Sequence, residues 1–299
     1  MNNSSNAAID IRDLVHRYGC ADAVNHLSLH VEPGICYGFF GRNGAGKTTT
    51  IKCLLNLLRP SSGSVRVFGL DPREGEPEIK SRIAYVPDFV AFYPWMNVRE
   101  TLDYQASFRS RWNREIESTL LAQFDLDPKQ PSNGLSKGQR TQLALIGAIA
   151  AEPDMLVLDE PTSGLDPLVR REFIQTVIGA YQDAVPGRRT VFVSTHLITE
   201  FEGLIDRFTI IDRGQEVLTA DADDARSRFR RFRASFEGDA PEAAAFRLAR
   251  SVKRSGRFVE LVVNGNGQEM AAVLQAMNPV EMASESLTLE EVFMESVRP

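Results

Sequence analysis

Apolar and polar positions change their period along the chain, and these changes predict an alternation of strands and helices. Residues 8–32 alternate with a period of about two, which is typical of short antiparallel strands. An apolar run at 35–40, a glycine-rich turn and a helix-like stretch at 48–58 follow. Further buried strands are predicted at 65–69, 82–87, 155–160, 189–195 and 208–214, with helices at 97–124, 136–151, 167–183 and 197–203. This alternation predicts an α/β core with a mainly parallel sheet.

The pattern changes after about residue 220. Two plausible strands, 247–256 and 257–265, are joined by a Ser-Gly turn, and helical segments follow at 268–277 and 288–297. We therefore expect a small accessory α+β domain over residues 222–299, after a first domain over residues 7–221. No internal repeat or low-complexity tract is evident in the sequence.

One concentrated basic run, residues 226–233, contains five arginines interleaved with phenylalanines. Such a run invites a nucleic-acid interpretation. However, Phe232, Ala234 and Phe236 alternate as on a half-buried strand, and Asp221, Asp223 and Asp224 precede or flank the run. We favour a solvated strand or helix face and expect no nucleic-acid partner.

Composition and charge narrow the class of protein. The chain has 299 residues, of which 43% are hydrophobic and 25% charged, as in ordinary globular proteins, and its net charge is −6. An acidic chain is not drawn to nucleic acid or anionic lipid by its overall field. The polar start lacks a secretory signal, and the longest apolar run, residues 143–151, is too short to span a bilayer. We expect a cytoplasmic protein that reaches membranes through a partner.

The three cysteines, Cys20, Cys36 and Cys53, predict neither a disulfide framework nor a metal site. They are few, they lie early in the chain, and they show no Cys-x-x-Cys spacing. We expect them to be buried free thiols.

Residues 41–48, GRNGAGKT, fit the pattern G-x-x-x-x-G-K-[ST] and lie between an apolar run and a helix, as a phosphate-binding loop requires. Gly41, Gly44 and Gly46 allow the backbone to wrap around phosphates and to present N–H groups at a helix N-terminus. Lys47 supplies a positive charge to the outer phosphates, and Thr48 can ligate Mg²⁺. The loop therefore predicts binding of a nucleotide.

A second segment, MLVLDEPTSGLD at 155–166, places Asp159 and Glu160 at the carboxyl end of a buried strand, where parallel sheets bind ligands. Asp159 is suited to holding Mg²⁺ through water, and Glu160 to polarising the attacking water. Taken alone, the pair would be explained as a helix cap after a strand. Beside a phosphate loop, we favour the metal and water roles.

Together with further motifs, these segments resemble the ATP-binding subunits of ABC transporters. LSKGQ at 135–139 resembles the signature usually written LSGGQ, and residues 163–166, SGLD, resemble the D-loop. STH at 194–196 supplies the switch histidine, and Tyr18 lies where the family has an aromatic that stacks on adenine. The motifs occur in family order over residues 10–220.

The resemblance implies an ABC cassette of the P-loop NTPase fold. It has a mainly parallel core, an antiparallel β subdomain and a helical subdomain at about 88–152, followed by the small α+β domain. ATP and Mg²⁺ are the implied cofactors, Glu160 and His196 the catalytic residues, and Thr48, Asp159 and Asp88 the metal residues. The implied nucleotide-binding residues are Tyr18, Gly41, Arg42, Asn43, Gly44, Ala45, Gly46, Lys47, Thr48, Thr49, Ser136, Gly138, Gln139 and Asp166.

The signature has a physical logic of its own. Ser136 is suited to capping a helix, and the free N–H groups of that helix end suit an anion. In the family this end meets the γ-phosphate of ATP bound to a second cassette. The resemblance therefore implies two paired copies of the chain beneath a separate membrane-spanning permease, on the cytoplasmic face of the cell membrane.

Two positions depart from the family pattern. Lys137 replaces a residue that is normally Gly, while Ser136 and Gly138 are kept. Asp88 stands where the family most often has Gln, which places the metal contact of this loop in question.

Aromatic residues gather directly after Asp88, in the segment 89–98. Pro94 and the irregular spacing indicate a loop, and part of the segment would be core. Loop aromatics often form docking surfaces. In the family this region receives a short cytoplasmic helix of the membrane subunit.

The final segment resembles the end of bacterial export-type cassettes, which favours export. A regulatory or ribosome-associated ABC ATPase that takes no part in transport remains an alternative. A DNA-associated ABC ATPase is disfavoured because those proteins carry a long coiled coil between the phosphate loop and the signature. Here 88 residues separate Lys47 from Leu135 (135 − 47).

Overall fold

A computed structural model describes residues 7–182 and 189–297 of the chain. The chain divides into two compact units, residues 1–218 and 219–299. Residue 183, the last of the helix expected at 167–183, lies outside the described residues, as do the first six and the last two residues.

The first unit contains an antiparallel sheet of three strands in the order β2-β1-β4. Its strands are β1 (Ile9–Tyr18), β2 (Ala21–Val31) and β4 (Ser62–Val67). Most of their buried positions carry apolar side chains that face one core. Strand β1 departs from the predicted period of two, because its buried positions come in runs of three that include Asp10 and His16.

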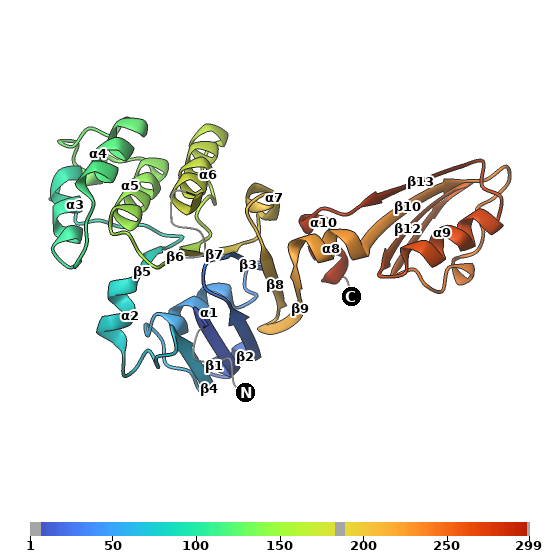
Figure 1. Ribbon diagram of the computed structural model, residues 1–299, viewed down its shortest axis with the longest axis horizontal. Coiled ribbons are helices and arrows are strands. Elements are labelled where there is room, and N and C mark those ends of the chain that lie inside the picture. The colour runs from blue at the N-terminus through green and yellow to red at the C-terminus, as the bar shows by residue number, and fades with distance from the viewer. Residues whose placement is uncertain (1–6, 183–188, 298–299) are drawn as a thin grey trace. The chain divides into compact units, whose positions relative to one another are not determined.

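The central sheet of the first unit has six strands in the order β5-β6-β7-β3-β8-β9. Its strands are β3 (Cys36–Gly41), β5 (Ile83–Val86), β6 (Met155–Asp159), β7 (Thr190–Thr195), β8 (Arg207–Asp212) and β9 (Gln215–Asp221). The pairs from β5 through β8 are all parallel. The carboxyl ends of these strands therefore meet at one edge, and the expected mainly parallel core is confirmed (Figure 1).

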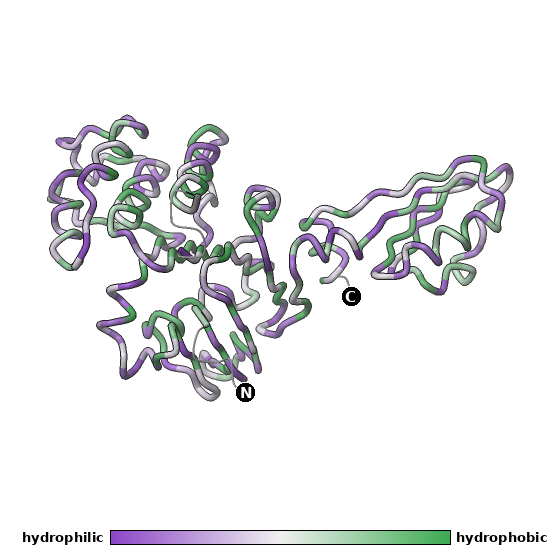
Figure 2. The backbone as a smooth tube through the Cα atoms, viewed as in Figure 1, coloured by the Kyte–Doolittle hydropathy of each residue, from purple (hydrophilic) through white to green (hydrophobic). Residues whose placement is uncertain are grey.

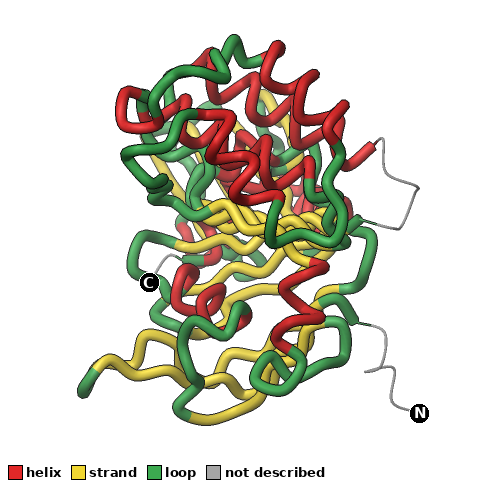
Figure 3. Tube along the Cα trace, turned by 90° about the vertical axis from the view of Figure 1, so that its left-hand side faces the viewer, coloured by secondary structure: helices red, strands yellow, loops and turns green. Residues whose placement is uncertain are grey.

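Helices lie on both sides of this sheet. Helix α1 (Lys47–Leu54) contacts strands of both sheets and lies between them. On the other side, two perpendicular views show the helical subdomain (Figures 1 and 3). Its helices are α3 (Val98–Ala106), α4 (Arg114–Gln123) and α5 (Lys137–Ala150). Helix α6 (Pro167–Gln182) follows β6 and contacts α5. The unit also contains α2 (Glu76–Arg82), α7 (Ile198–Phe201) and a 3₁₀ turn at Ser132–Gly134.

The prediction of one helix over 97–124 is wrong, because the chain breaks it between α3 and α4. Asn113 begins α4 with a side-chain cap: its Oδ1 accepts hydrogen bonds from the amides of Glu115 and Ile116 at 3.1 Å. An N-cap residue has extended backbone angles, so a helix cannot continue through it. Helix α7 is likewise shorter than the predicted 197–203.

The core of the first unit is built from apolar strand residues, drawn green along the central sheet in Figure 2. Phe192 on β7 is fully buried and packs against Tyr37 and Phe39 of β3, with ring centroids 5.9 and 5.5 Å apart. Burying one such ring contributes roughly 2–3 kcal/mol to folding.

The cysteines differ in part from expectation. All three are free thiols, and Cys36 and Cys53 are buried, but Cys20 is exposed in the turn between β1 and β2. Burial raises the pKa of Cys53 to about 11, so this thiol stays protonated.

The second unit is an α+β fold with an antiparallel sheet in the order β11-β12-β10-β13. Its strands are β10 (Phe229–Ser235), β11 (Ser251–Ser255), β12 (Phe258–Asn264) and β13 (Glu281–Ser286), and its helices are α8 (Ala222–Arg228), α9 (Gly267–Ala276) and α10 (Leu289–Ser296). A 3₁₀ turn lies at Ala243–Ala245. Phe232, Ala234 and Phe236 are buried against α9 residues Met270 and Leu274, as their alternation predicts.

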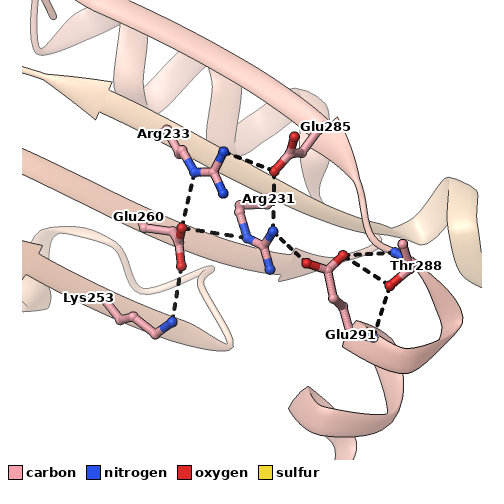
Figure 4. A network of polar contacts seen from close by, with 7 residues as sticks. All are labelled: Arg231, Arg233, Lys253, Glu260, Glu285, Thr288 and Glu291. Atoms are coloured by element: carbon pink, nitrogen blue, oxygen red, sulfur yellow. Dashed lines mark hydrogen bonds and ion pairs between the residues drawn. The ribbon is translucent and has the colours of Figure 1, made fainter. Parts of the chain in front are cut away.

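The basic run ends in strand β10, and its arginines on the face away from α9 are matched by carboxylates (Figure 4). Arg231 lies 2.7 Å from Glu291 and 3.2 Å from Glu285, and it also contacts Glu260. Arg233 pairs with Glu260 at 3.1 Å. The run therefore spans the end of α8 and most of β10, in agreement with the expected strand or helix face.

Across residues 7–182 and 189–297, no helix has both the length and the apolar character needed to cross a membrane.

Candidate functional site

The predicted phosphate loop connects β3 to α1 at the carboxyl edge of the central sheet. Gly46 precedes α1 with a φ of 104°, and a Cβ there would lie 2.4 Å from the carbonyl oxygen of Ala23. Gly44 has a φ of 83°. The loop is therefore held in a conformation that only glycine adopts without strain, which leaves the amides at the start of α1 open to an anion.

Lys47 is buried and turns back into this loop. Its Nζ donates to the carbonyl oxygens of Gly41 at 2.7 Å and Arg42 at 3.2 Å. It also lies 2.8 Å from Oε1 of Glu160. The structure thus brings the predicted lysine and the predicted catalytic carboxylate into one ion pair.

Asp159 is the last residue of β6 and is fully buried. Its Oδ1 accepts a hydrogen bond from the Ser194 hydroxyl of β7 at 3.0 Å, whereas Oδ2 has no hydrogen-bond partner in the described part of the chain. Burial raises the pKa of Asp159, while hydrogen bonds from Thr48 and Ser194 and the charge of Lys47 partly offset the rise. A buried carboxylate oxygen without a partner is open to a cation.

Glu160 adopts a φ of 48°, in the left-handed region that glutamate rarely occupies. Its amide donates to the Ser194 carbonyl at 2.8 Å, and its Oε2 lies 2.8 Å from Nδ1 of His196. A carboxylate oxygen only accepts, so Nδ1 carries the hydrogen and Nε2 is left for another group. The carboxylate of Glu160 therefore lies between Lys47 and His196, and backbone strain of this kind is typical of functional sites.

The other residues predicted for the loop differ in exposure. Ala45 is buried, Thr48 and Thr49 are half-buried, and Arg42 and Asn43 are exposed.

Tyr18 ends β1 with 52% of its surface exposed. The ring of His16 contacts it edge-on with centroids 4.8 Å apart, and Nδ1 of His16 donates to the Arg59 carbonyl at 2.9 Å. Tyr18 is thus an exposed ring on a fixed support. Its contact with adenine stays a prediction.

Asp88 is exposed and lies just after β5. Burial raises the pKa of nearby Tyr85, and the negative charges of Asp159 and Asp88 raise it further. Asp88 therefore belongs to the same acidic neighbourhood as Asp159, and a direct metal contact stays a prediction.

The signature serine caps α5 as its sequence predicts. Ser136 Oγ accepts from the amide of Gln139 at 3.2 Å, and Oε1 of Gln139 accepts from the amide of Ser136 at 3.0 Å. Gly138 faces α6, where a Cβ would lie 3.2 Å from Val169. The exposed end of α5 keeps the free amides of a helix N-terminus.

Asp166 caps the next helix. Its Oδ1 accepts from the amides of Leu168 at 3.1 Å and Val169 at 3.2 Å, at the start of α6. This cap is the role visible in the structure, and a nucleotide contact of Asp166 stays a prediction.

The sequence reasoning missed a buried network beside Glu160. The Thr162 hydroxyl donates to Glu200 on α7, and Arg170 on α6 pairs with Glu200 at 2.6 Å. Glu200 lies in the short helix α7 that begins two residues after His196, and no local sequence pattern identifies its partners Thr162 and Arg170.

The aromatic segment after Asp88 is a loop, as predicted, and it carries an exposed patch. We define the aromatic patch as Phe89, Tyr93, Trp95, Tyr104 and Phe108. Phe89 is 79% and Trp95 73% exposed. Tyr93 stacks on Trp95 with centroids 4.8 Å apart and meets Tyr104 edge-on at 5.5 Å. A neighbouring pocket of about 420 Å³ is lined in part by Phe89, Phe92 and Phe108.

Comparison with known proteins gives consistent matches. The family model described as "ABC transporter" matches residues 24–163. The chain is 34% identical over 226 residues to the bacitracin transport ATP-binding protein BcrA of Bacillus licheniformis, covering 75% of this chain and 73% of the relative. It is 35% identical over 216 residues to the Nod factor export ATP-binding protein I of Burkholderia orbicola (strain AU 1054), covering 71% and 70%.

A solved structure described as the ATP-binding subunit of an ABC transporter matches with a TM-score of 0.66 and 26% identity. The match covers 74% of this chain and 92% of that one. With the loop, the paired carboxylates and the histidine at one edge of the sheet, these matches show that the chain belongs to the ABC transporter ATP-binding proteins, the ATP-hydrolysing subunits of these transporters.

Proposed function

We propose that this subunit powers the export of a substrate through a separate membrane-spanning permease, acting as one of two paired copies. The observation that carries the proposal is the convergence of Lys47, Asp159, Glu160 and His196 at the carboxyl edge of one parallel sheet. Export is supported by the relatives, one of which is a Nod factor export protein and another a bacitracin transport protein.

The phosphate loop binds the triphosphate of ATP. The amides of residues 41–49 surround the phosphates, since glycines at 44 and 46 hold the loop open toward the helix end. Lys47 turns from its present partners to the outer phosphates. Tyr18 offers its exposed ring to adenine.

The residues present fit Mg²⁺. Asp159 has one buried oxygen without a protein partner, and Thr48 offers a hydroxyl beside it. A site with few protein ligands suits Mg²⁺, which keeps several waters and substrate phosphate oxygens. The bound ion would neutralise charge on the outer phosphates. Asp88 is a further candidate for contact with this ion through water.

Glu160 takes the proton of the attacking water at its carboxylate. His196 holds that carboxylate through Nδ1–H and turns its Nε2 toward the γ-phosphate. The left-handed backbone at Glu160 fixes the direction of the carboxylate before the nucleotide arrives.

A second copy of the chain completes each site. The capped end of α5, with Ser136, Gly138 and Gln139, supplies free amides for the phosphates of ATP bound to the other copy, and Asp166 lies at that interface. Each copy thus contributes a phosphate loop to one site and a signature to the other.

The aromatic patch is our proposed contact with the permease. Its rings are large, stacked and exposed, as residues at interface centres often are. The occupant is a short cytoplasmic helix of the permease, which holds the chain on the cytoplasmic face of the membrane.

The direct test pairs the chain with a multi-span membrane protein that is sought among the products of the neighbouring genes. In inverted vesicles, export predicts ATP-dependent accumulation of substrate in the lumen, and Lys47→Ala in the same complex supplies the matched control. A chain that hydrolyses ATP but neither binds the membrane protein nor drives accumulation contradicts the transport proposal. Depletion of preloaded vesicles contradicts the direction.

A further inference from the structure

Lys137 is the residue at which this chain departs from the family signature. Its positive charge lies at a position in the helix that does not favour a cation. It is the first residue of α5, and the first turn of that helix contains no acidic residue. A cation at a helix N-terminus is opposed by the helix dipole. A residue that breaks a local rule often has its partner elsewhere in the fold.

That partner is the loop after Glu160. Nζ of Lys137 donates to the carbonyl oxygen of Ser163 at 2.6 Å. Gly164, with a φ of 68°, makes room for it, because a Cβ at this position would lie 3.0 Å from Nζ. The lysine therefore lies directly against the backbone of residues 163–164.

The contact leads back to Glu160 in one further hydrogen bond. The amide of Ser163 donates to the carbonyl of Glu160 at 3.1 Å, closing a tight turn. The other end of the loop is held separately, since the Arg170 guanidinium donates to the Leu165 carbonyl at 3.2 Å. Lys137 therefore secures the half of the loop that contains the strained Glu160.

We propose that Lys137 is a positioning residue for Glu160, holding the turn 160–163 from the start of the signature helix. The inference rests on the proposed role of Glu160 in ATP hydrolysis. The contact from Lys137 connects two parts of the same chain. These are helix α5, which on our proposal contacts the nucleotide of the other copy, and the carboxylate of Glu160, which acts on the chain's own nucleotide.

The test measures ATP hydrolysis by the full chain carrying Lys137→Met, which keeps the length of the side chain and removes the donor. We expect kcat to fall by about fivefold, the order of one lost hydrogen bond of ordinary net strength, with ATP affinity unchanged. Lys137→Arg restores a donor and most of the rate. Lys129→Met, at an exposed lysine outside the site, is the matched control.

A double-mutant cycle separates this role from a contact with the second nucleotide. If Lys137 acts through Glu160, Lys137→Met causes no further loss of single-turnover hydrolysis in a Glu160→Gln chain. The inference is overturned if Lys137→Met leaves kcat unchanged, if Arg fails to rescue, or if the same fold loss persists beside Glu160→Gln. An inactive wild-type chain would instead contradict the proposed function.

Discussion

At the scale of single residues, the site contains charged groups that contact one another directly. Glu160 neutralises Lys47 on one side and holds His196 on the other. Such a carboxylate is preorganised, because its partners fix its direction in a buried setting. Replacement of Glu160 is therefore expected to slow ATP hydrolysis while ATP binding is kept.

Glu160→Gln should bind ATP and hydrolyse it at least about 100-fold more slowly, because the amide takes no proton from water. Hydrolysis and ATP binding are measured on the same purified sample, and size-exclusion chromatography with ATP and Mg²⁺ should show a trapped dimer. Hydrolysis near the wild-type rate would exclude Glu160 as the base.

Asp159 is expected to lower stability at neutral pH in the absence of nucleotide. Its pKa is raised in the folded chain by burial. The folded chain therefore tolerates protonated Asp159 better than ionised Asp159. The free energy of unfolding falls as pH rises from the pKa of Asp159 in the unfolded chain through its raised pKa in the folded chain. Asp159→Asn should therefore melt above the wild type at pH 7, by a few degrees, with the difference shrinking toward pH 4. It should also lose Mg²⁺-dependent hydrolysis. An equal difference at both pH values contradicts this account.

At the scale of elements, the sequence predicts segments with a clear pattern of apolar and polar residues. It does not predict contacts between residues far apart in the chain. The phosphate loop, the buried strands and the Ser136 cap follow from local patterns. The sequence pattern does not predict strand β13, because most residues of this strand are exposed at a sheet edge. The contact from Lys137 to Ser163 spans 26 residues and depends on how α5 meets the loop, so no local pattern reports it.

The pair α3 and α4 is joined by a buried carboxylate. Glu117 accepts from Trp112 Nε1 at 2.5 Å and Arg114 at 2.9 Å, and it also pairs with Arg99 of α3. Glu117→Ala should cost about 2 kcal/mol of unfolding free energy, because it removes several hydrogen bonds to one buried, charged carboxylate. Urea denaturation measures the loss. Glu115→Ala, on the exposed face of the same helix, should cost less than about 1 kcal/mol.

At the scale of the whole molecule, the chain consists of two units, each with its own core. The motifs that show the family all lie in the first unit. The second unit is recognisable from its sequence as α+β, and its charged sheet face is balanced within itself (Figure 4).

Assembly with the permease is the prediction at this scale. Trp95→Ala and Tyr93→Ala should each reduce co-purification with the membrane subunit by about tenfold or more, since truncated interface aromatics commonly cost 2 kcal/mol or more. ATP binding should be unchanged. Phe258→Ala, an exposed aromatic of the second unit, serves as the control. Undiminished co-purification of the Trp95 and Tyr93 variants would place the permease elsewhere.

The ion pair between Lys47 and Glu160 links the proposed binding of ATP to the proposed base. Glu160 is the counter-ion of Lys47, and on our proposal the triphosphate of ATP takes over that role. On that proposal, ATP exchanges one anion for another at the ammonium group of Lys47 and frees the Glu160 carboxylate to act on water. On our proposal, the binding of ATP is therefore what frees Glu160 to act as the base.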